Sequence, residues 1–154
     1  MNTIEFVHKL KQVPKFSNNS LNSRIEHLEF MVSGKPLRGY LQIEKFDLIG
    51  SLGWTKNIQY EIKKINEFLG IEGPELKTLR SCFYVCPECG DIGCGAITAK
   101  IQFMSEQVIW KEFGFEDNLS GPNLESYSTV GPFIFDREEY SALFESLKKQ
   151  LSFL

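Results

Sequence analysis

The segment from Ser81 to Gly95 holds all four cysteines of the chain and three of its twelve glycines. An apolar stretch leads into this segment and another leads out, so we expect two strands joined by a rigid bend that carries the thiols. Within the bend, the run Cys86-Pro87-Glu88-Cys89-Gly90 has the form of a zinc knuckle, in which a glycine lets backbone amides point at two sulfurs. Residues 86–95 (the cysteine turn) are therefore the first candidate for a functional site.

The size and composition of the chain are those of a soluble globular domain. Its 154 residues are enough to bury a core without disulfide staples, and 42% of them are hydrophobic and 24% charged. The formal net charge is −3, and the basic residues are dispersed along the chain. Because a protein that follows a phosphate backbone needs a basic stripe, we expect no nucleic-acid partner.

The sequence also lacks the apolar segments of membrane and secreted proteins. No apolar run approaches the roughly 18–20 residues of a spanning helix, so we expect no membrane association. Glu5, His8 and Lys9 interrupt the apolar residues near the N-terminus, which is not the pattern of a secretion signal. We therefore expect a cytoplasmic protein, whose cysteines lie in a reducing compartment where structural disulfides are rare.

The first 23 residues predict a helix followed by a loop. Asn2 and Glu5 form a capping pair, three residues apart, at the start of the segment. The apolar face of the helix would consist of Ile4, Val7 and Leu10. Residues 15–23 are rich in Asn and Ser and indicate a turn-rich connection.

Two more helices and about six strands follow. Apolar residues spaced by three and four predict a helix over residues 58–69, and Asp136 with Glu139 forms a capping box for a last helix. Alternating patterns predict strands at residues 28–32, 37–43, 80–86, 97–103, 107–115 and 133–135. Residues 116–131 indicate a long surface loop. We predict one α+β domain over residues 1–154, with a mainly antiparallel sheet.

Zinc is one interpretation of the cysteine turn. The α-carbons of ligands around one zinc lie within about 7 Å of one another, because each thiolate is about 2.3 Å from the metal. If residues 82–86 are extended, the α-carbons of Cys82 and Cys86 are about 13 Å apart, at about 3.3 Å per residue. The candidate ligands are then Cys86, Cys89 and Cys94, and the fourth ligand would be His8, His27 or Asp91.

Two other interpretations of the same cysteines stay open. A reactive Cys-x-x-Cys pair works best at a helix N-terminus, and the glycine-rich segment after Cys89 is a poor helix opening. Alternatively, the cysteines pack as small hydrophobic side chains while the glycines form a tight loop between strands. We favour this structural role, in which no cofactor is bound, with zinc as the alternative cofactor.

Three blocks of the sequence resemble the signature of a family of small uncharacterised bacterial proteins. The blocks are YVCPECGDIGCGAIT at residues 84–98, VIWKEFG at 108–114 and GPFIFDREEY at 131–140. The resemblance spans roughly residues 28–150. It implies membership of that family and supplies no catalytic residues.

The remaining polar residues suggest a surface for a partner more than a catalytic site. His8 and His27 are expected to be exposed, so a general base is scarce. Of the carboxylates, Asp136 is expected to cap a helix, and Glu112 has no assigned role. The predicted partner surface consists of Asp91, Trp110, Glu116, Asp117 and Tyr127, on the cysteine turn, a strand and the 116–130 loop.

We therefore expect a non-catalytic cytosolic binding or interaction protein with a protein partner. Its size and acidic charge are similar to those of immunity-type proteins that neutralise a toxin, and that likeness is an analogy only. The alternative is a thiol-redox or zinc-dependent enzyme centred on Cys86, Cys89 and Cys94.

Overall fold

The computed structural model describes residues 1–14, 22–88, 90 and 92–151. Its strands are β1 (Ile4–Pro14), β2 (Asn22–Val32), β3 (Lys35–Pro36), β4 (Ile49–Gly50), β5 (Ser81–Val85), β6 (Ala96–Phe103), β7 (Gln107–Glu116) and β8 (Phe133–Asp136), and its α-helices are α1 (Leu37–Leu41), α2 (Ile58–Leu69) and α3 (Arg137–Leu151). The strands form two antiparallel sheets, in the orders β1-β2-β3 and β4-β5-β6-β7-β8. The predicted α+β class is confirmed.

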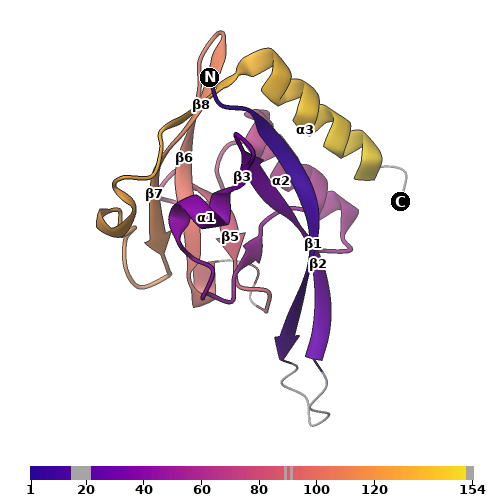
Figure 1. Cartoon of the computed structure of the whole chain (residues 1–154), viewed down its shortest axis with the longest axis vertical. Helices are drawn as coiled ribbons and strands as arrows, with labels where there is room; N and C mark the ends of the chain where they lie inside the picture. Colours follow the sequence, from indigo (N-terminus) through magenta and orange to yellow (C-terminus); the bar gives the residue numbers. More distant parts are fainter. Residues whose placement is uncertain (15–21, 89, 91, 152–154) are drawn as a thin grey trace.

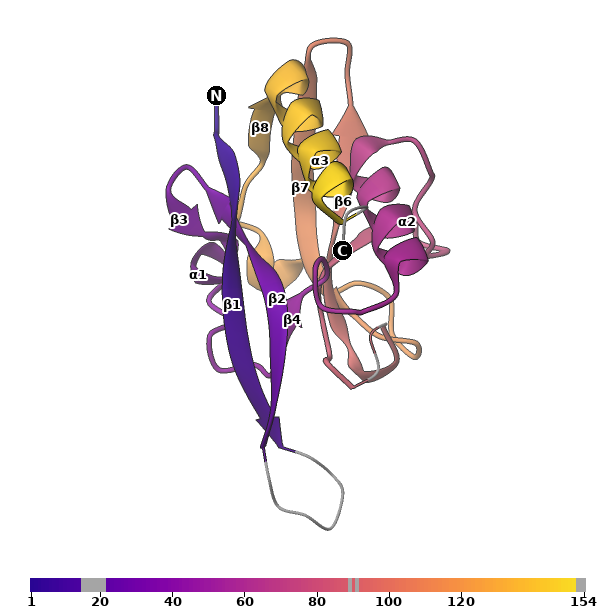
Figure 2. The same ribbon diagram turned by 90° about the vertical axis from the view of Figure 1, so that its right-hand side faces the viewer.

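Helices α2 and α3 cover one face of the five-stranded sheet, and the β1–β2 ribbon lies beside them (Figures 1 and 2). Aromatic rings from all these parts meet in the core. The ring centroid of Phe30 in β2 lies 5.6 Å from that of Phe68 in α2 and 5.7 Å from that of Trp110 in β7. Trp110 is fully buried, and its Nε1 donates a hydrogen bond to the hydroxyl of Tyr140 at 3.1 Å. One hydrophobic core therefore joins the ribbon to the larger sheet.

The predicted N-terminal helix is wrong, because residues 4–14 form strand β1. Ile4 and Phe6 pack against the core, whereas Val7 and Leu10 are 36% and 60% exposed. The apolar residues that matter are therefore two apart, and the spacing of three that included Val7 was coincidental. Tertiary contact decides the outcome, since the Phe6 ring makes an edge contact with Phe144 of α3.

The two strands of the ribbon are paired along their whole length, from Ile4–Val32 to Pro14–Asn22. The end that carries Pro14 and Asn22 projects beyond the rest of the molecule (Figure 1). The predicted loop over residues 15–23 falls mostly at 15–21, which lie outside the described residues. Its last two residues belong to β2.

The second strand of the predicted hairpin is also wrong, because residues 37–41 form helix α1. Leu37 and Leu41 are four apart and both buried, which is the spacing of one helical face. Pro36 precedes the helix in an extended conformation, and Gln42 ends it in the left-handed region at φ 56°. The short helix then folds back over the ribbon, because the Tyr40 hydroxyl donates to the Val32 carbonyl at 3.1 Å.

A bulge in β5 changes which side chains face the core. The pairing with β6 shifts between Cys82 and Tyr84, so that Phe83 and Tyr84 both reach the main core. Cys82 and Val85 instead join a smaller buried cluster with Ile49. A strict alternation of faces along the strand predicted at residues 80–86 is therefore broken, because the bulge shifts the side chains after Cys82.

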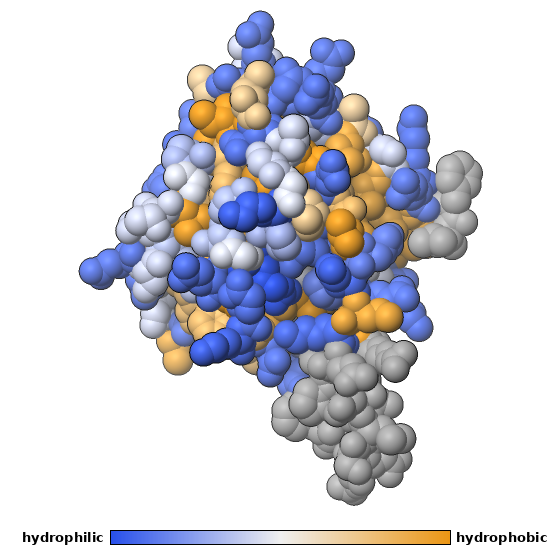
Figure 3. All heavy atoms as spheres, viewed as in Figure 1, coloured by the Kyte–Doolittle hydropathy of each residue, from blue (hydrophilic) through white to orange (hydrophobic). Residues whose placement is uncertain are grey.

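No helix among the described residues is both long enough and apolar enough to cross a membrane. The face that carries α1 shows mostly hydrophilic and intermediate residues, with apolar residues in separate small groups (Figure 3). The predicted helices over residues 58–69 and after Asp136 are confirmed as α2 and α3.

Candidate functional site

A polar cavity lined by a buried histidine lies between the ribbon and α1. Its volume is about 500 Å³. The lining residues are Lys9, Leu10 and Lys11 of β1, His27 and Glu29 of β2, and Pro36, Arg38, Gly39 and Glu44 in and around α1. This cavity (the ribbon cleft) exists because the ribbon is covered on both faces: one face meets the core, and the other meets α1 and β4. His27 and Glu29 are on the second face.

His27 forms the floor of the ribbon cleft. The prediction that it is exposed is wrong, since only 3% of the residue is accessible. Its Nδ1 accepts a hydrogen bond from the backbone N–H of Gly50 at 3.1 Å. That approach requires a glycine, because a Cβ at position 50 would lie 2.0 Å from the Leu28 carbonyl oxygen. A neutral imidazole that accepts at Nδ1 carries its proton on Nε2.

Besides the bond from Gly50, the His27 ring forms a hydrogen bond with the Leu28 backbone, and the residue lines the ribbon cleft. Burial lowers the pKa of His27, with a smaller opposing contribution from the Leu28 backbone and a further lowering by Arg38. The ring is therefore held neutral near pH 7. It presents a hydrogen-bond donor to the ribbon cleft, while the lone pair that a general base would need is occupied by Gly50.

Glu29 lies on the same strand face as His27, and both of its carboxylate oxygens accept hydrogen bonds. Its Oε1 accepts from Arg38 Nε at 2.8 Å, and its Oε2 accepts from the Phe30 N–H at 3.1 Å and from the Tyr84 hydroxyl. Burial and the Glu29 carboxylate raise the pKa of Tyr84 well above its usual value. The negative charge of Glu29 is thus compensated inside the protein and does not need a cation in the cleft.

Arg38 extends from α1 over this carboxylate. Besides its bond to Glu29, its Nη2 donates to the Leu48 carbonyl at 2.7 Å, and its guanidinium lies 5.1 Å from the centroid of the Tyr84 ring. Its Nη1 has no hydrogen-bond partner among the described residues. Arg38 therefore retains one donor edge for a group that enters the ribbon cleft.

The rim of the ribbon cleft carries two lysines of β1. Lys9 is exposed and makes no ion pair with a described residue, whereas Lys11 donates to the Phe46 carbonyl at 3.2 Å and lies 3.6 Å from Asp47. Glu44 is the one acidic residue of the lining besides Glu29. The groups of the cleft that can bind an anion are thus a ring N–H, one guanidinium edge and one ammonium.

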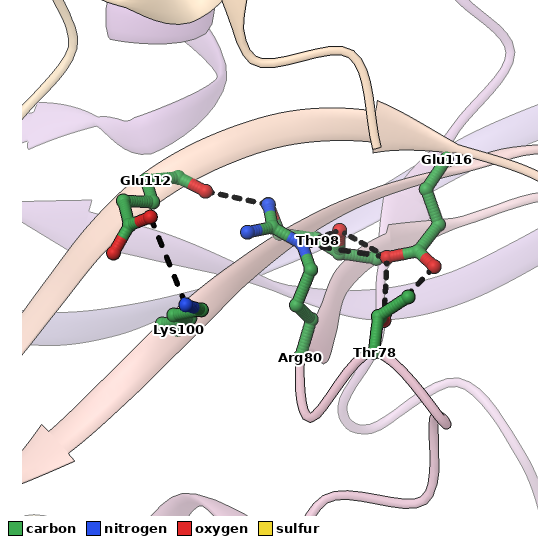
Figure 4. A network of polar contacts seen from close by, with 6 residues as sticks. All are labelled: Thr78, Arg80, Thr98, Lys100, Glu112 and Glu116. Atoms are coloured by element: carbon green, nitrogen blue, oxygen red, sulfur yellow. Dashed lines mark hydrogen bonds and ion pairs between the residues drawn. The ribbon is translucent and has the colours of Figure 1, made fainter. Parts of the chain in front are cut away.

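A second buried Arg–Glu pair connects the segment before β5 to β6 and β7 (Figure 4). Arg80 donates to the Thr98 hydroxyl at 2.9 Å and to its carbonyl at 2.8 Å, and its Nε lies 3.4 Å from Glu116 Oε1. The same Glu116 oxygen accepts from the Thr98 hydroxyl at 2.8 Å, and the other accepts from Thr78 at 3.0 Å. The interpretation of Glu116 as a solvated loop residue is wrong, since it ends β7 and is 3% exposed.

Arg80 also fixes an irregularity of β7. The pairing of β6 with β7 shifts between Thr98 and Lys100, and Glu112 adopts φ 55° at this bulge. The carbonyl of Glu112 turns toward Arg80 and accepts from its Nη2 at 2.5 Å. Both Glu116 oxygens and this carbonyl are therefore satisfied, which makes the network a structural fastening rather than a ligand site.

The cysteine turn contains both free and bonded cysteines. Cys82 is buried, and burial raises the pKa of its thiol to about 11 in spite of the nearby Lys64. Cys86 is a half-buried free thiol, and Cys94 is disulfide-bonded, contrary to the expectation that disulfides are absent. Cys89 and Asp91 lie outside the described residues. Within the described part of the chain, no three Cys, His, Asp or Glu side chains converge as metal ligands.

The predicted partner surface does not form as expected. Trp110 and Tyr127 are buried in the core, and Glu116 belongs to the Arg80 network, so none of the three can present a surface to a partner. Asp117 is half-buried, and its Oδ1 accepts from the backbone N–H groups of Leu119 and Ser120. Its role is therefore that of a turn residue.

Comparison of the chain with protein-family models, with curated proteins and with solved structures found no match. The resemblance to a family of small bacterial proteins therefore stays a prediction. The functional argument depends on the geometry of the ribbon cleft, whose residues the sequence reasoning missed. One signal was available: Gly50 interrupts an apolar run, which is typical of a close backbone approach.

Proposed function

We propose that this chain is a non-catalytic binding protein, and that the ribbon cleft takes a carboxylate or phosphate group of its ligand. The observation that carries the proposal is the convergence of His27, Arg38 and Lys9 on one cavity, where the His27 ring can offer an N–H to an acceptor. A donor in this position gains a full hydrogen bond when an acceptor enters, since little water competes for it. An anionic acceptor is favoured over a neutral one by Arg38 and Lys9.

The chemistry of the cleft supports binding more than acid–base catalysis. Neither His27 nor Tyr84 offers a free lone pair or a mobile proton, because Gly50 occupies Nδ1 of the first and the Glu29 carboxylate holds the hydroxyl of the second. Both therefore act as fixed donors that keep their shape when a ligand enters.

The test is a titration of the full chain with inorganic phosphate and, separately, with acetate. The ¹⁵N resonance of His27 Nε2 should shift saturably with at least one of these anions, because the ring N–H would donate to the anion. Lys9→Ala should weaken binding about fivefold, which corresponds to about 1 kcal/mol for one charge-assisted contact. Lys149→Ala, on α3 away from the cleft, is the matched control and should change nothing. A His27 resonance that stays unchanged with both anions would exclude the proposal.

A second candidate, thiol–disulfide exchange, is favoured by one observation: a free Cys86 thiol and a disulfide-bonded Cys94 occupy the same turn. A Cys86 thiolate would attack one sulfur of that disulfide, form a new S–S bond and release the other sulfur as a thiolate, with no net change in electrons. Zinc would compete with this chemistry, because a disulfide-bonded cysteine cannot be a thiolate ligand.

Alkylation of the native protein distinguishes these possibilities. Under exchange chemistry, iodoacetamide should modify Cys86 rapidly near neutral pH, whereas Cys82 should stay unmodified because its thiol is buried and its pKa is raised to about 11. Slow modification of Cys86 would exclude exchange. Elemental analysis of the reduced protein tests zinc, which should fall below one ion per chain if Cys86, Cys89 and Cys94 have a structural role.

A further inference from the structure

The outer edge of β1 carries backbone groups that no described strand pairs. The Thr3 carbonyl accepts from the Ser33 N–H at 2.9 Å, so the odd-numbered residues of β1 direct their backbone groups toward β2 and the even-numbered ones direct theirs outward. Asn2 follows this rule, since its N–H donates to the Ile134 carbonyl at 2.8 Å. Beyond Asn2, the outward groups belong to Ile4, Phe6, His8, Leu10 and Gln12, and they have no backbone partner among the described residues.

This free edge is long, straight and partly apolar. β1 is an outermost strand of its sheet and runs from Ile4 to Pro14. Helix α3 runs beside the part of β1 near the N-terminus (Figure 1), and no described strand other than β2 pairs with β1 over residues 4–14. Leu10 is 60% exposed and stands next to the unpaired groups. Natural proteins shield such edges or use them for pairing, because an unpaired strand edge is a template for another strand.

We propose that β1 pairs with β1 of a second copy of this chain, antiparallel and about a two-fold axis at Val7. In that register Ile4 faces Leu10 of the second copy and Phe6 faces His8, so the outward groups of these four residues form ladder hydrogen bonds. The ladder ends before Gln12, which would face Asn2, because Asn2 is already bonded to Ile134. The pairing needs no ligand in the ribbon cleft, but it engages Lys9, which also lies on the rim of that cleft.

Charge complementarity selects a second copy as the occupant. In the register about Val7, Glu5 of each chain lies opposite Lys9 of the other, which gives two ion pairs at the cross-strand distance of about 4.5–5.5 Å. Lys11 already interacts with Asp47 and falls opposite the neutral Thr3, so no like charges meet. A shift of the register by one residue to either side would remove the Glu5–Lys9 pairs.

Sedimentation of the full chain over micromolar to millimolar concentrations tests the pairing. The wild type should approach twice the monomer mass of 17.7 kDa. Glu5→Lys should shift the protein to the monomer, because it places two lysines opposite each other, and the double exchange Glu5→Lys with Lys9→Glu should restore the dimer. His8→Pro removes an outward N–H without removing a bond to β2, so it should give a folded monomer.

Val7→Pro is the matched control, since it removes an N–H that bonds to β2 and should disrupt the ribbon itself. A wild type that stays monomeric over the whole range overturns the proposal, as does a dimer that survives both Glu5→Lys and His8→Pro. A dimer that is lost with His8→Pro but not with Glu5→Lys overturns the register about Val7. The phosphate titration of His27 is read from a different atom, so failure of either proposal is seen separately.

Discussion

The two buried Arg–Glu pairs of this protein have the same chemistry and different surroundings. Arg80 and Glu116 are 2% and 3% exposed as residues, and Thr98 and Thr78 complete the coordination of the carboxylate. The side chain of Arg38 is 16% exposed and that of Glu29 is 3% exposed, and their partners are Tyr84 and backbone groups. Of the first pair, Glu116 lies with Thr78 against a cavity of about 510 Å³, whereas both Arg38 and Glu29 of the second pair line the ribbon cleft.

The difference shows how solvent access separates a structural pair from a functional one. Burying two charges costs several kcal/mol per ion, and good geometry with extra hydrogen bonds is needed to offset that cost. Around Arg80, Nε and Nη2 bond to Thr98 and to the Glu112 carbonyl and so connect β6 to the bulge of β7, while Nη1 makes no bond to the residues drawn in Figure 4. Around Arg38 the carboxylate is satisfied, but the guanidinium and the neighbouring His27 ring line the ribbon cleft.

The largest loss of stability is expected when the carboxylate of Glu116 is removed. Glu116→Ala should lower the free energy of unfolding by about 3–5 kcal/mol, because Arg80 is left buried without its counter-charge. Urea denaturation followed by circular dichroism measures this change. A loss below about 1 kcal/mol would mean that water reaches Arg80, and the contrast between the two pairs would then disappear.

Removing a hydrogen bond from the Arg38–Glu29 pair should lower the free energy of unfolding by a smaller amount. Tyr84→Phe should lower the free energy of unfolding by about 1–3 kcal/mol, because Glu29 loses one of its donors in a buried position. The same denaturation assay applies. Tyr40→Phe is a matched control, since the Tyr40 hydroxyl is only partly buried and donates to a neutral carbonyl, and we expect a smaller loss of about 0.5–1.5 kcal/mol. Equal losses in the two variants would argue against a special role for the Glu29 network.

The sequence was sufficient for elements whose signals are local. Helix α3 begins where Asp136 and Glu139 predict it, and the Glu139 N–H donates to Asp136 at 3.0 Å. Helix α2 likewise ends at Gly70, which is left-handed at φ 78°. Both signals lie within one turn of the helix they define. The equally local Asn2–Glu5 pair predicted a helix that does not form, because residues 4–14 pair with β2.

The ribbon cleft could not be predicted in this way, because burial of its residues depends on distant segments. An alternating strand predicts that one face is solvated, and His27 and Glu29 lie on that polar face. Here the polar face is covered by α1 and β4, which contact β2 only in the folded chain. The same limitation explains Glu116, whose partners Arg80 and Thr98 lie 36 and 18 positions earlier in the sequence (116 − 80 and 116 − 98). Alternation of apolar and polar residues identifies a strand, but it does not show which distant segments cover its two faces.

Acidification should affect the open site through His27. Because burial lowers the folded-state pKa of His27 below its usual value, the unfolded chain binds a proton more readily than the folded chain. The stabilisation is fully present above the unfolded-state pKa of about 6.5 and is lost as the pH falls toward the folded-state value. Thermal unfolding between pH 7.5 and pH 5 should therefore show a decrease in stability that His27→Gln reduces. The His8→Gln variant is the control, and it should keep the wild-type slope.

The smallest change in stability is expected for the exposed ion pair next to the Arg80–Glu116 network. Lys100 and Glu112 lie 3.8 Å apart with side chains 46% and 42% exposed, so solvent screens their attraction. Lys100→Ala should change the free energy of unfolding by less than about 0.5 kcal/mol, because only the backbone carbonyl of Glu112 contributes to the coordination of Arg80. A double-mutant cycle of Lys100→Ala with Glu116→Ala measures whether the exposed pair and the buried pair act independently. A coupling above about 1 kcal/mol would show that the network extends to the surface, because sites without shared partners add within about 0.5 kcal/mol. Arg80 and Glu116 would then be open to solvent effects in the same way as Arg38 and Glu29.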